Sequence, residues 1–144
     1  MGWVYEIPFN PLQGKGVDMQ VLDDMIRKAL NDGLLEVDTE NGKVYSLLKG
    51  TRHELKGESN KKGYKRFSFY INGQRCHFRF NRVVYIAQHG FIPEDMMIDH
   101  INNDKNDNRI CNLQALTNAD NIRKSFSDKR NRMAMQPSLF GWER

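Results

Sequence analysis

Four polar residues in the last third of the chain could support hydrolysis: Asp99, His100, Asn112 and Asn121. Histidine ordinarily titrates at about pH 6.5, so His100 could accept a proton from water near neutral pH. Carboxylate and amide oxygens suit Mg²⁺, which keeps several of its waters, and this makes Asp99 and Asn121 candidate metal ligands. Cutting a phosphodiester requires such a set, because water must be activated and charge neutralised at phosphorus and on the leaving oxygen.

The spacing of the whole set carries more information than the Asp-His pair at its start. An isolated Asp-His pair in a turn is usually a surface feature that only makes hydrogen bonds. Here Asn112 lies twelve residues after His100, and Asn121 lies nine residues after Asn112. An Asn- and Asp-rich run fills most of the interval and ends at Arg109. The complete set therefore favours a catalytic interpretation over a surface one.

Two short strands must position the first part of this set. Residues 96–98 predict a buried strand that leads directly into Asp99, and residues 113–116 predict a second strand. Neighbours on a regular strand face opposite sides, so Asp99 and His100 converge on one site only if the strand ends or twists there. The Asn-rich run after Ile101 predicts such an ending.

A helix is expected to follow the second strand. Thr117 and Asp120 have the spacing of a capping box, which places Asn121 in the first turns of the helix. Residues three or four apart share a helix face, so Lys124 would lie near Asn121 and could reach a phosphate there. Arg123 would point elsewhere.

The charges of the chain are segregated along its length. Residues 1–40 contain 3 Lys or Arg against 8 Asp or Glu, residues 41–90 contain 11 against 2, and residues 91–144 contain 8 against 8. A basic middle segment is typical of a protein that binds a polyanion. A solvated lysine-rich loop without a partner is the alternative that charge alone leaves open.

The basic segment contains a predicted hairpin and helix. Residues 64–71 and 74–80 alternate around Asn72-Gly73, a strong type I′ turn signal, so one face would be apolar and the other largely basic. Residues 82–90 predict a short helix that ends at Gly90. A polar loop is expected at residues 57–63. The other histidines are expected to have structural or surface roles: His53, His77 and His89.

An acidic segment precedes this region. Asp18 can cap a helix whose apolar residues recur on one face between Val21 and Leu30. Residues 34–37 and 43–48 flank an Asn-Gly turn and predict a hairpin. The negative charge of the helix argues against its lying in a DNA groove, so we expect it to pack on the core.

Composition restricts the class of protein. With 144 residues, 39% of them hydrophobic, the chain can bury one modest core, which excludes two large domains. It contains no apolar run of the roughly 18 residues that span a bilayer and no signal sequence at its start, so we expect a soluble intracellular protein that contacts no membrane. Cys76 and Cys111 form no CxxC pair and predict neither a zinc site nor a disulfide framework.

Over residues 44–126 the order of these elements resembles that of phage- and intron-associated HNH homing endonucleases. The resemblance implies a phage-encoded protein that acts in the host cytoplasm. The resemblance implies a ββα-metal finger that cuts or nicks double-stranded DNA with one Mg²⁺ or Mn²⁺. In that family the residues at these positions would bind the metal (Asp99 and Asn121), activate water (His100), and hold the loop and orient the base (Asn112). Two positions depart from the family: Asn81 stands where His is common, and Asn103 where Gly is common.

We therefore expect an α+β nuclease composed of small antiparallel hairpins, a ββα-metal module and an N-terminal helical segment. The expected segments are an acidic helical region (1–43), a basic hairpin and short helix (44–90), the metal module (91–126) and a polar tail (127–144). The expected DNA contacts are Lys65, Arg66, Arg75, Arg79, Arg82, Arg109 and Lys124. Two alternatives stay open: a non-catalytic DNA-binding protein or mobile-element regulator that keeps the scaffold, and a structure-specific or RNA-directed nuclease. Either a monomer or a homodimer is compatible with the sequence.

Overall fold

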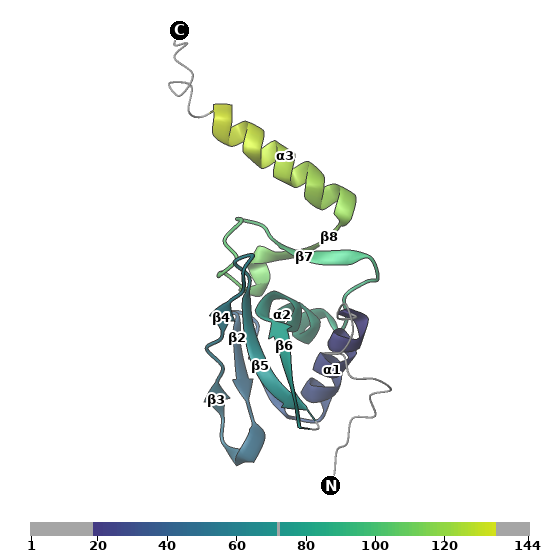
Figure 1. Cartoon of the computed structure of the whole chain (residues 1–144), viewed down its shortest axis with the longest axis vertical. Coiled ribbons are helices and arrows are strands. Elements are labelled where there is room, and N and C mark those ends of the chain that lie inside the picture. Colours follow the sequence, from purple (N-terminus) through teal and green to yellow (C-terminus); the bar gives the residue numbers. More distant parts are fainter. Residues whose placement is uncertain (1–18, 72, 135–144) are drawn as a thin grey trace.

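A computed structural model describes residues 19–71 and 73–134 of the chain (Figure 1). Its helices are α1 (Met19–Asn31), α2 (Phe80–His89), α3 (Asn118–Ala134) and the short 3₁₀ turns η1 (Leu48–Gly50) and η2 (Ile110–Asn112). Its strands are β1 (Leu35–Asp38), β2 (Lys43–Ser46), β3 (His53–Glu54), β4 (Glu58–Ser59), β5 (Lys65–Ile71), β6 (Gln74–Arg79), β7 (Met96–His100) and β8 (Leu113–Thr117). They form three antiparallel sheets, β1-β2-β3, β4-β5-β6 and β7-β8, which confirms the α+β class.

Helix α1 packs on the core with one apolar face, as its periodicity predicts. Leu22, Met25, Ile26 and Ala29 are buried, whereas the residues between them are mostly exposed. Apolar residues at this spacing lie on one side of a helix, and their burial holds α1 beside α2 (Figure 1). The capping residue expected for this helix, Asp18, lies outside the described residues.

The β5–β6 hairpin has the expected alternation. Its register pairs Ile71 with Gln74, which leaves a two-residue connection whose first member, Asn72, lies outside the described residues. Phe67, Phe69 and Phe78 face the core. Two segments expected to be loops contain the short strands β3 and β4, because backbone pairing with β2 and β5 extends the sheets whatever the polarity of the side chains.

Helix α2 connects this hairpin to the last sheet. It ends at Gly90, whose φ of 90° is the left-handed conformation that glycine accepts without strain. The buried Asn81 donates through Nδ2 to the carbonyl oxygen of Ile98 at 3.0 Å, so it ties α2 to β7. The departure from the family at this position is therefore a packing contact.

The segment boundaries expected from sequence do not coincide with breaks in the fold. A boundary between residues 43 and 44 would cut the β1–β2 ladder, where Val37 pairs with Val44. Buried residues from α1 to β8 form one core. Each small sheet has an apolar face that must be covered by other elements, so the sheets and helices pack together. Helix α3 continues to Ala134, past the expected start of a tail at residue 127. None of the described helices is long and apolar enough to cross a membrane.

Candidate functional site

The site is built where β7 and β8 meet helix α3. Strand β7 ends at His100, as the Asn-rich run predicts, and pairs Asp99 with Gln114 and His100 with Leu113. Both residues belong to the regular strand, so their side chains leave opposite faces. His100 is buried, with 3% of its surface exposed, whereas Asp99 is half-buried. The strand does not turn both side chains to one point.

A cavity of about 220 Å³ brings the two expected metal ligands together. Asp99 from β7 and Asn121 from the first turns of α3 both line it, with Lys62, Tyr64 and Arg79. The capping bond that starts α3 is present, because the backbone N–H of Asp120 donates to Thr117 Oγ1 at 3.2 Å. The position of Asn121 therefore follows from the local sequence, as expected.

The carboxylate of Asp99 already has a cationic neighbour. Lys124 Nζ lies 3.3 Å from Asp99 Oδ2, and Gln114 Nε2 donates to the same oxygen at 2.9 Å. Lys124 also donates to Asn103 Oδ1 and forms an ion pair with Asp128. Lys124 therefore lies beside Asp99, and its expected contact with a DNA phosphate would compete with these carboxylates.

The donor atoms suit a hard divalent cation that keeps much of its hydration. A carboxylate and an amide oxygen share one cavity, and the position beside Asp99 already accommodates positive charge. Within residues 19–71 and 73–134, no three His, Cys, Asp or Glu side chains converge to hold an ion. Water and substrate phosphate would have to complete the coordination, which is the usual arrangement for Mg²⁺.

His100 has a different partner from the one expected. Its Nε2 lies 2.8 Å from Oδ1 of Asn108, which is buried with it. Its ring packs on Tyr64 with centroids 6.0 Å apart, and Tyr64 also lines the cavity of Asp99 and Asn121. The ring of His100 therefore adjoins that cavity through Tyr64, although it is not part of its wall.

Asn112 holds the loop between β7 and β8. Its Nδ2 donates to Asn102 Oδ1 and to the carbonyl oxygen of Asp107, both at 2.9 Å, and its Oδ1 accepts the backbone N–H of Asn102. The geometry agrees with the expected loop-holding role. No described contact joins Asn112 to the ring of His100, so any effect of Asn112 on the base passes through the loop.

Arg109 belongs to the same loop and is paired within it. Its Nε and Nη2 donate to the two carboxylate oxygens of Asp107, each at 2.8 Å. These hydrogen bonds hold the pKa of the Asp107 carboxyl well below its ordinary value and raise the pKa of Arg109. The expected contact of Arg109 with DNA would compete with this pair.

The outer face of the β5–β6 hairpin is basic. Arg66 pairs in register with Arg79, and Arg75 lies further along the same face of β6. Arg66 Nη2 also pairs with Glu58 Oε2 on β4 at 3.3 Å, so a polyanion on this face would compete for Arg66 while meeting the charges of Arg75 and Arg79. Burial and the charges of Arg66 and Arg75 lower the pKa of the neighbouring His77. Lys65 lies on the opposite face, with Nζ 4.6 Å from the centre of the Phe80 ring.

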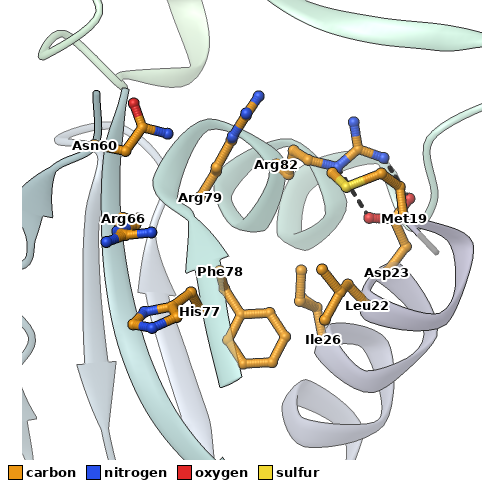
Figure 2. A pocket seen from close by; sticks show the side chains of 10 residues that line it. All are labelled: Met19, Leu22, Asp23, Ile26, Asn60, Arg66, His77, Phe78, Arg79 and Arg82. Carbon is orange, nitrogen blue, oxygen red and sulfur yellow. Dashed lines mark hydrogen bonds and ion pairs between the residues drawn. The ribbon is translucent and has the colours of Figure 1, made fainter. Parts of the chain in front are cut away.

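Arg82 has an internal partner. Its Nε and Nη2 donate to the two oxygens of Asp23 on α1, at 3.1 and 2.6 Å, and both side chains are largely buried. Figure 2 shows this pair at the edge of a cavity between α1 and β6, which Arg79 also lines. Arg82 also lines the cavity of Asp99 and Asn121, so its contact with DNA stays a prediction and would compete with the ion pair that fixes α1 to α2.

Three residues around the base were not singled out from the sequence: Gly42, Tyr64 and Asn108. Tyr64 stands in a Gly-Tyr pair and Asn108 in an Asp-Asn-Arg run, so both were visible as parts of motifs. Neither motif shows that the side chains meet His100, because Tyr64 comes from the segment before β5 and Asn108 reaches the ring only when the loop after β7 folds back. Gly42 had a sequence signal only as a turn residue.

Two comparisons match this chain to proteins of one kind. A family profile described as HNH endonuclease matches residues 78–123. A solved structure, entitled "DNA binding and cleavage by the HNH homing endonuclease I-HmuI", superposes with a TM-score of 0.58 at 27% sequence identity. The match covers 74% of this chain and 63% of that one, so this chain spans less than two thirds of the length of I-HmuI. Curated proteins give no match. Since the matched residues contain α2, β7, β8 and the start of α3, residues 78–123 of this chain match the HNH endonuclease family, and the fold around them is similar to that of an HNH homing endonuclease.

Proposed function

We propose that the protein is a metal-dependent DNA endonuclease that nicks one strand at a time. The observation that carries the proposal is the cavity shared by Asp99 and Asn121, with the ring of His100 next to it across Tyr64. A histidine beside two oxygen ligands is the combination that phosphodiester hydrolysis needs. The family of the domain and the activity named for I-HmuI support the same conclusion.

In the proposed reaction, His100 takes a proton from a water molecule. The water oxygen attacks phosphorus in line, and the bond from phosphorus to the 3′ oxygen breaks. Asp99 and Asn121 would hold a divalent cation, which supplies the positive charge that stabilises the transition state and the leaving oxygen. Asn112 keeps the loop after His100 in one conformation through its three side-chain hydrogen bonds.

The substrate proposed is double-stranded DNA, held at its phosphates by the basic face of the hairpin. Arg66, Arg75 and Arg79 present their charge on that face, and Lys62 and Arg79 also line the cavity at Asp99. Phosphate contacts position a duplex without reading its sequence. A single site in each chain cuts one strand, so a double-strand break would need two nicks or two chains.

A non-catalytic DNA-binding protein is the second candidate. The burial of His100, with only 3% of its surface exposed, favours it, as does the ion pair that occupies Asp99. Such a protein would keep the basic face and its salt-dependent affinity for DNA without cutting it.

Incubation with supercoiled plasmid in Mg²⁺, Mn²⁺ or EDTA distinguishes the two. We expect nicked circles with either metal and none in EDTA. Replacement of His100 by Ala should slow nicking by about 10²–10⁴-fold, the usual contribution of a general base. His53→Ala is the matched control, because His53 is exposed on β3, away from the site. Binding of plasmid without nicking by the wild-type protein would support the second candidate.

A further inference from the structure

The turn between β1 and β2 touches the backbone of the loop that follows His100. Gly42 has a φ of 68°, and a Cβ atom there would lie 2.5 Å from the carbonyl carbon of Asn108 and 2.7 Å from its oxygen. The backbone N–H of Ile110 donates to the carbonyl oxygen of Thr39 at 2.9 Å. A turn 66 residues earlier in the chain therefore fits against Asn108 with no room for a side chain.

The loop is also held on its other side. Lys105 Nζ donates to the carbonyl oxygen of Lys62 at 2.6 Å and lies 4.4 Å from the centre of the Tyr64 ring. Tyr64 in turn packs on the ring of His100. Two turns from two different sheets thus limit how far the segment between residues 105 and 108 can move.

The contact between Asn108 and His100 has a chemical consequence. An amide oxygen can only accept a hydrogen bond, so Asn108 Oδ1 at 2.8 Å from Nε2 requires the proton of the neutral ring to be on Nε2. The lone pair is then on Nδ1, which becomes the nitrogen able to accept a proton. The reverse amide orientation would place the proton on Nδ1 and leave no acceptor there.

We infer that Asn108 is a positioning residue for His100, held in register by the close approach of Gly42. This inference rests on the proposed function, because it gives His100 a role as proton acceptor. It assigns the choice of tautomer to Asn108 and assigns the placement of Asn108 to the β1–β2 turn, outside the matched domain.

The tautomer can be measured without any nuclease activity. Long-range ¹H–¹⁵N spectra of the full chain with labelled histidine, at about pH 9 where histidine is ordinarily neutral, distinguish a proton on Nε2 from one on Nδ1. We expect the Nε2–H form for His100 in the wild type and in Asn108→Asp, which keeps an oxygen acceptor. In Asn108→Leu, which has similar size and no acceptor, the two forms should mix. The inference fails if the wild-type ring carries its proton on Nδ1, or if Asn108→Leu leaves the spectrum unchanged.

A matched pair of glycine substitutions tests the role of the turn. Gly33 and Gly42 have φ values of 75° and 68°, so alanine is strained equally at both, but only at Gly42 would its Cβ meet another residue. Gly42→Ala should shift the resonances of Asn108 and His100 and reduce kcat for nicking by about 10–100-fold with little change in KM, because the base is displaced. Gly33→Ala should do neither.

Equal behaviour of the two glycine variants would overturn the role of the turn. If Gly42→Ala does not fold, the two Asn108 variants still decide the positioning role through the tautomer. If the wild-type protein cuts no DNA, the ring spectra stand by themselves, so failure of the proposed nuclease and failure of the positioning inference give different results.

Discussion

The end of β7 with the loop after it forms one half of the site and helix α3 forms the other, and the two are held very differently. The loop is crossed by the hydrogen bonds of Asn112 and abutted by two turns from other sheets. Helix α3 extends away from the rest of the molecule (Figure 1), and Phe126 on it is 65% exposed. The base is thus set by the body of the protein, whereas Asn121 is carried on an element attached mainly at its first turns.

Because the two halves are held by different contacts, each can be disturbed without the other. Two side chains of α3 connect them: Lys124 lies within reach of Asp99 and Asn103, and Asp128 accepts a hydrogen bond from Asn103 Nδ2 at 2.9 Å. Loss of a ligand on α3 should weaken metal binding and leave the loop intact. Loss of a loop contact should disturb the base first.

The largest expected effect is on metal affinity. Asn121→Ala removes one of two protein ligands, and since loss of an outer partner alone costs about 10–100-fold in affinity, we expect at least about 100-fold weaker Mn²⁺ binding. Calorimetric titration with Mn²⁺ measures it. Ser125→Ala, on the same helix, is the control. Unchanged affinity in Asn121→Ala would mean that Asn121 is not a ligand.

The next effect is on stability and belongs to the loop. Asn112→Ala removes three hydrogen bonds made by a buried side chain, each worth about 0.5–1.5 kcal/mol, so we expect a loss of about 1–3 kcal/mol in the free energy of unfolding. Urea unfolding provides the value. Asn121→Ala should unfold as the wild type does, and an equal loss in both variants would show that the halves are not separate.

A smaller effect is expected from acid. Because the hydrogen bonds from Arg109 lower the pKa of Asp107 in the folded protein, this pair stabilises the fold above the ordinary carboxyl pKa and is lost as the pH falls below about 4. Arg109→Gln should reduce this acid dependence. Between pH 5 and 3, protection of the backbone amides against hydrogen exchange, relative to the intrinsic rate at each pH, should fall in the loop of Arg109 before it falls in α3. Earlier exchange in α3 would reverse the comparison.

The smallest effect is expected on the outer part of α3. Phe126 is largely exposed, so Phe126→Ser should change the free energy of unfolding by no more than about 0.5 kcal/mol. Thermal unfolding of the variant beside the wild type checks this. A larger loss would show that α3 is packed more firmly than its exposure indicates.

Much of the fold could be predicted from local pattern. Apolar periodicity and the Gly90 stop located α2, and the Thr117 capping bond located the start of α3, because these signals act within a few residues. Asp99 and Asn121 line one cavity because the same local elements place the end of β7 beside the start of α3.

The partners of the site side chains could not be predicted in the same way. Arg82 and Asp23 are 59 residues apart, and Gly42 meets Asn108 only after two sheets have packed together. Sequence spacing describes which face of a strand or helix a residue occupies, but it does not say which other face it meets. For this reason the ion pair of Arg82 with Asp23 and the close approach of Gly42 to Asn108 could not be predicted.

The most direct test of the whole account is the response of two variants to metal concentration. Nicking by Asn121→Ala and by His100→Ala would be followed on supercoiled plasmid while Mg²⁺ or Mn²⁺ is raised over three decades. We predict that a high metal concentration restores much of the nicking rate of Asn121→Ala, because that variant loses only metal affinity. The same concentration should restore none of the nicking rate of His100→Ala. Recovery of both variants, or of neither, would contradict a site divided between a base at the end of β7 and a metal ligand on α3.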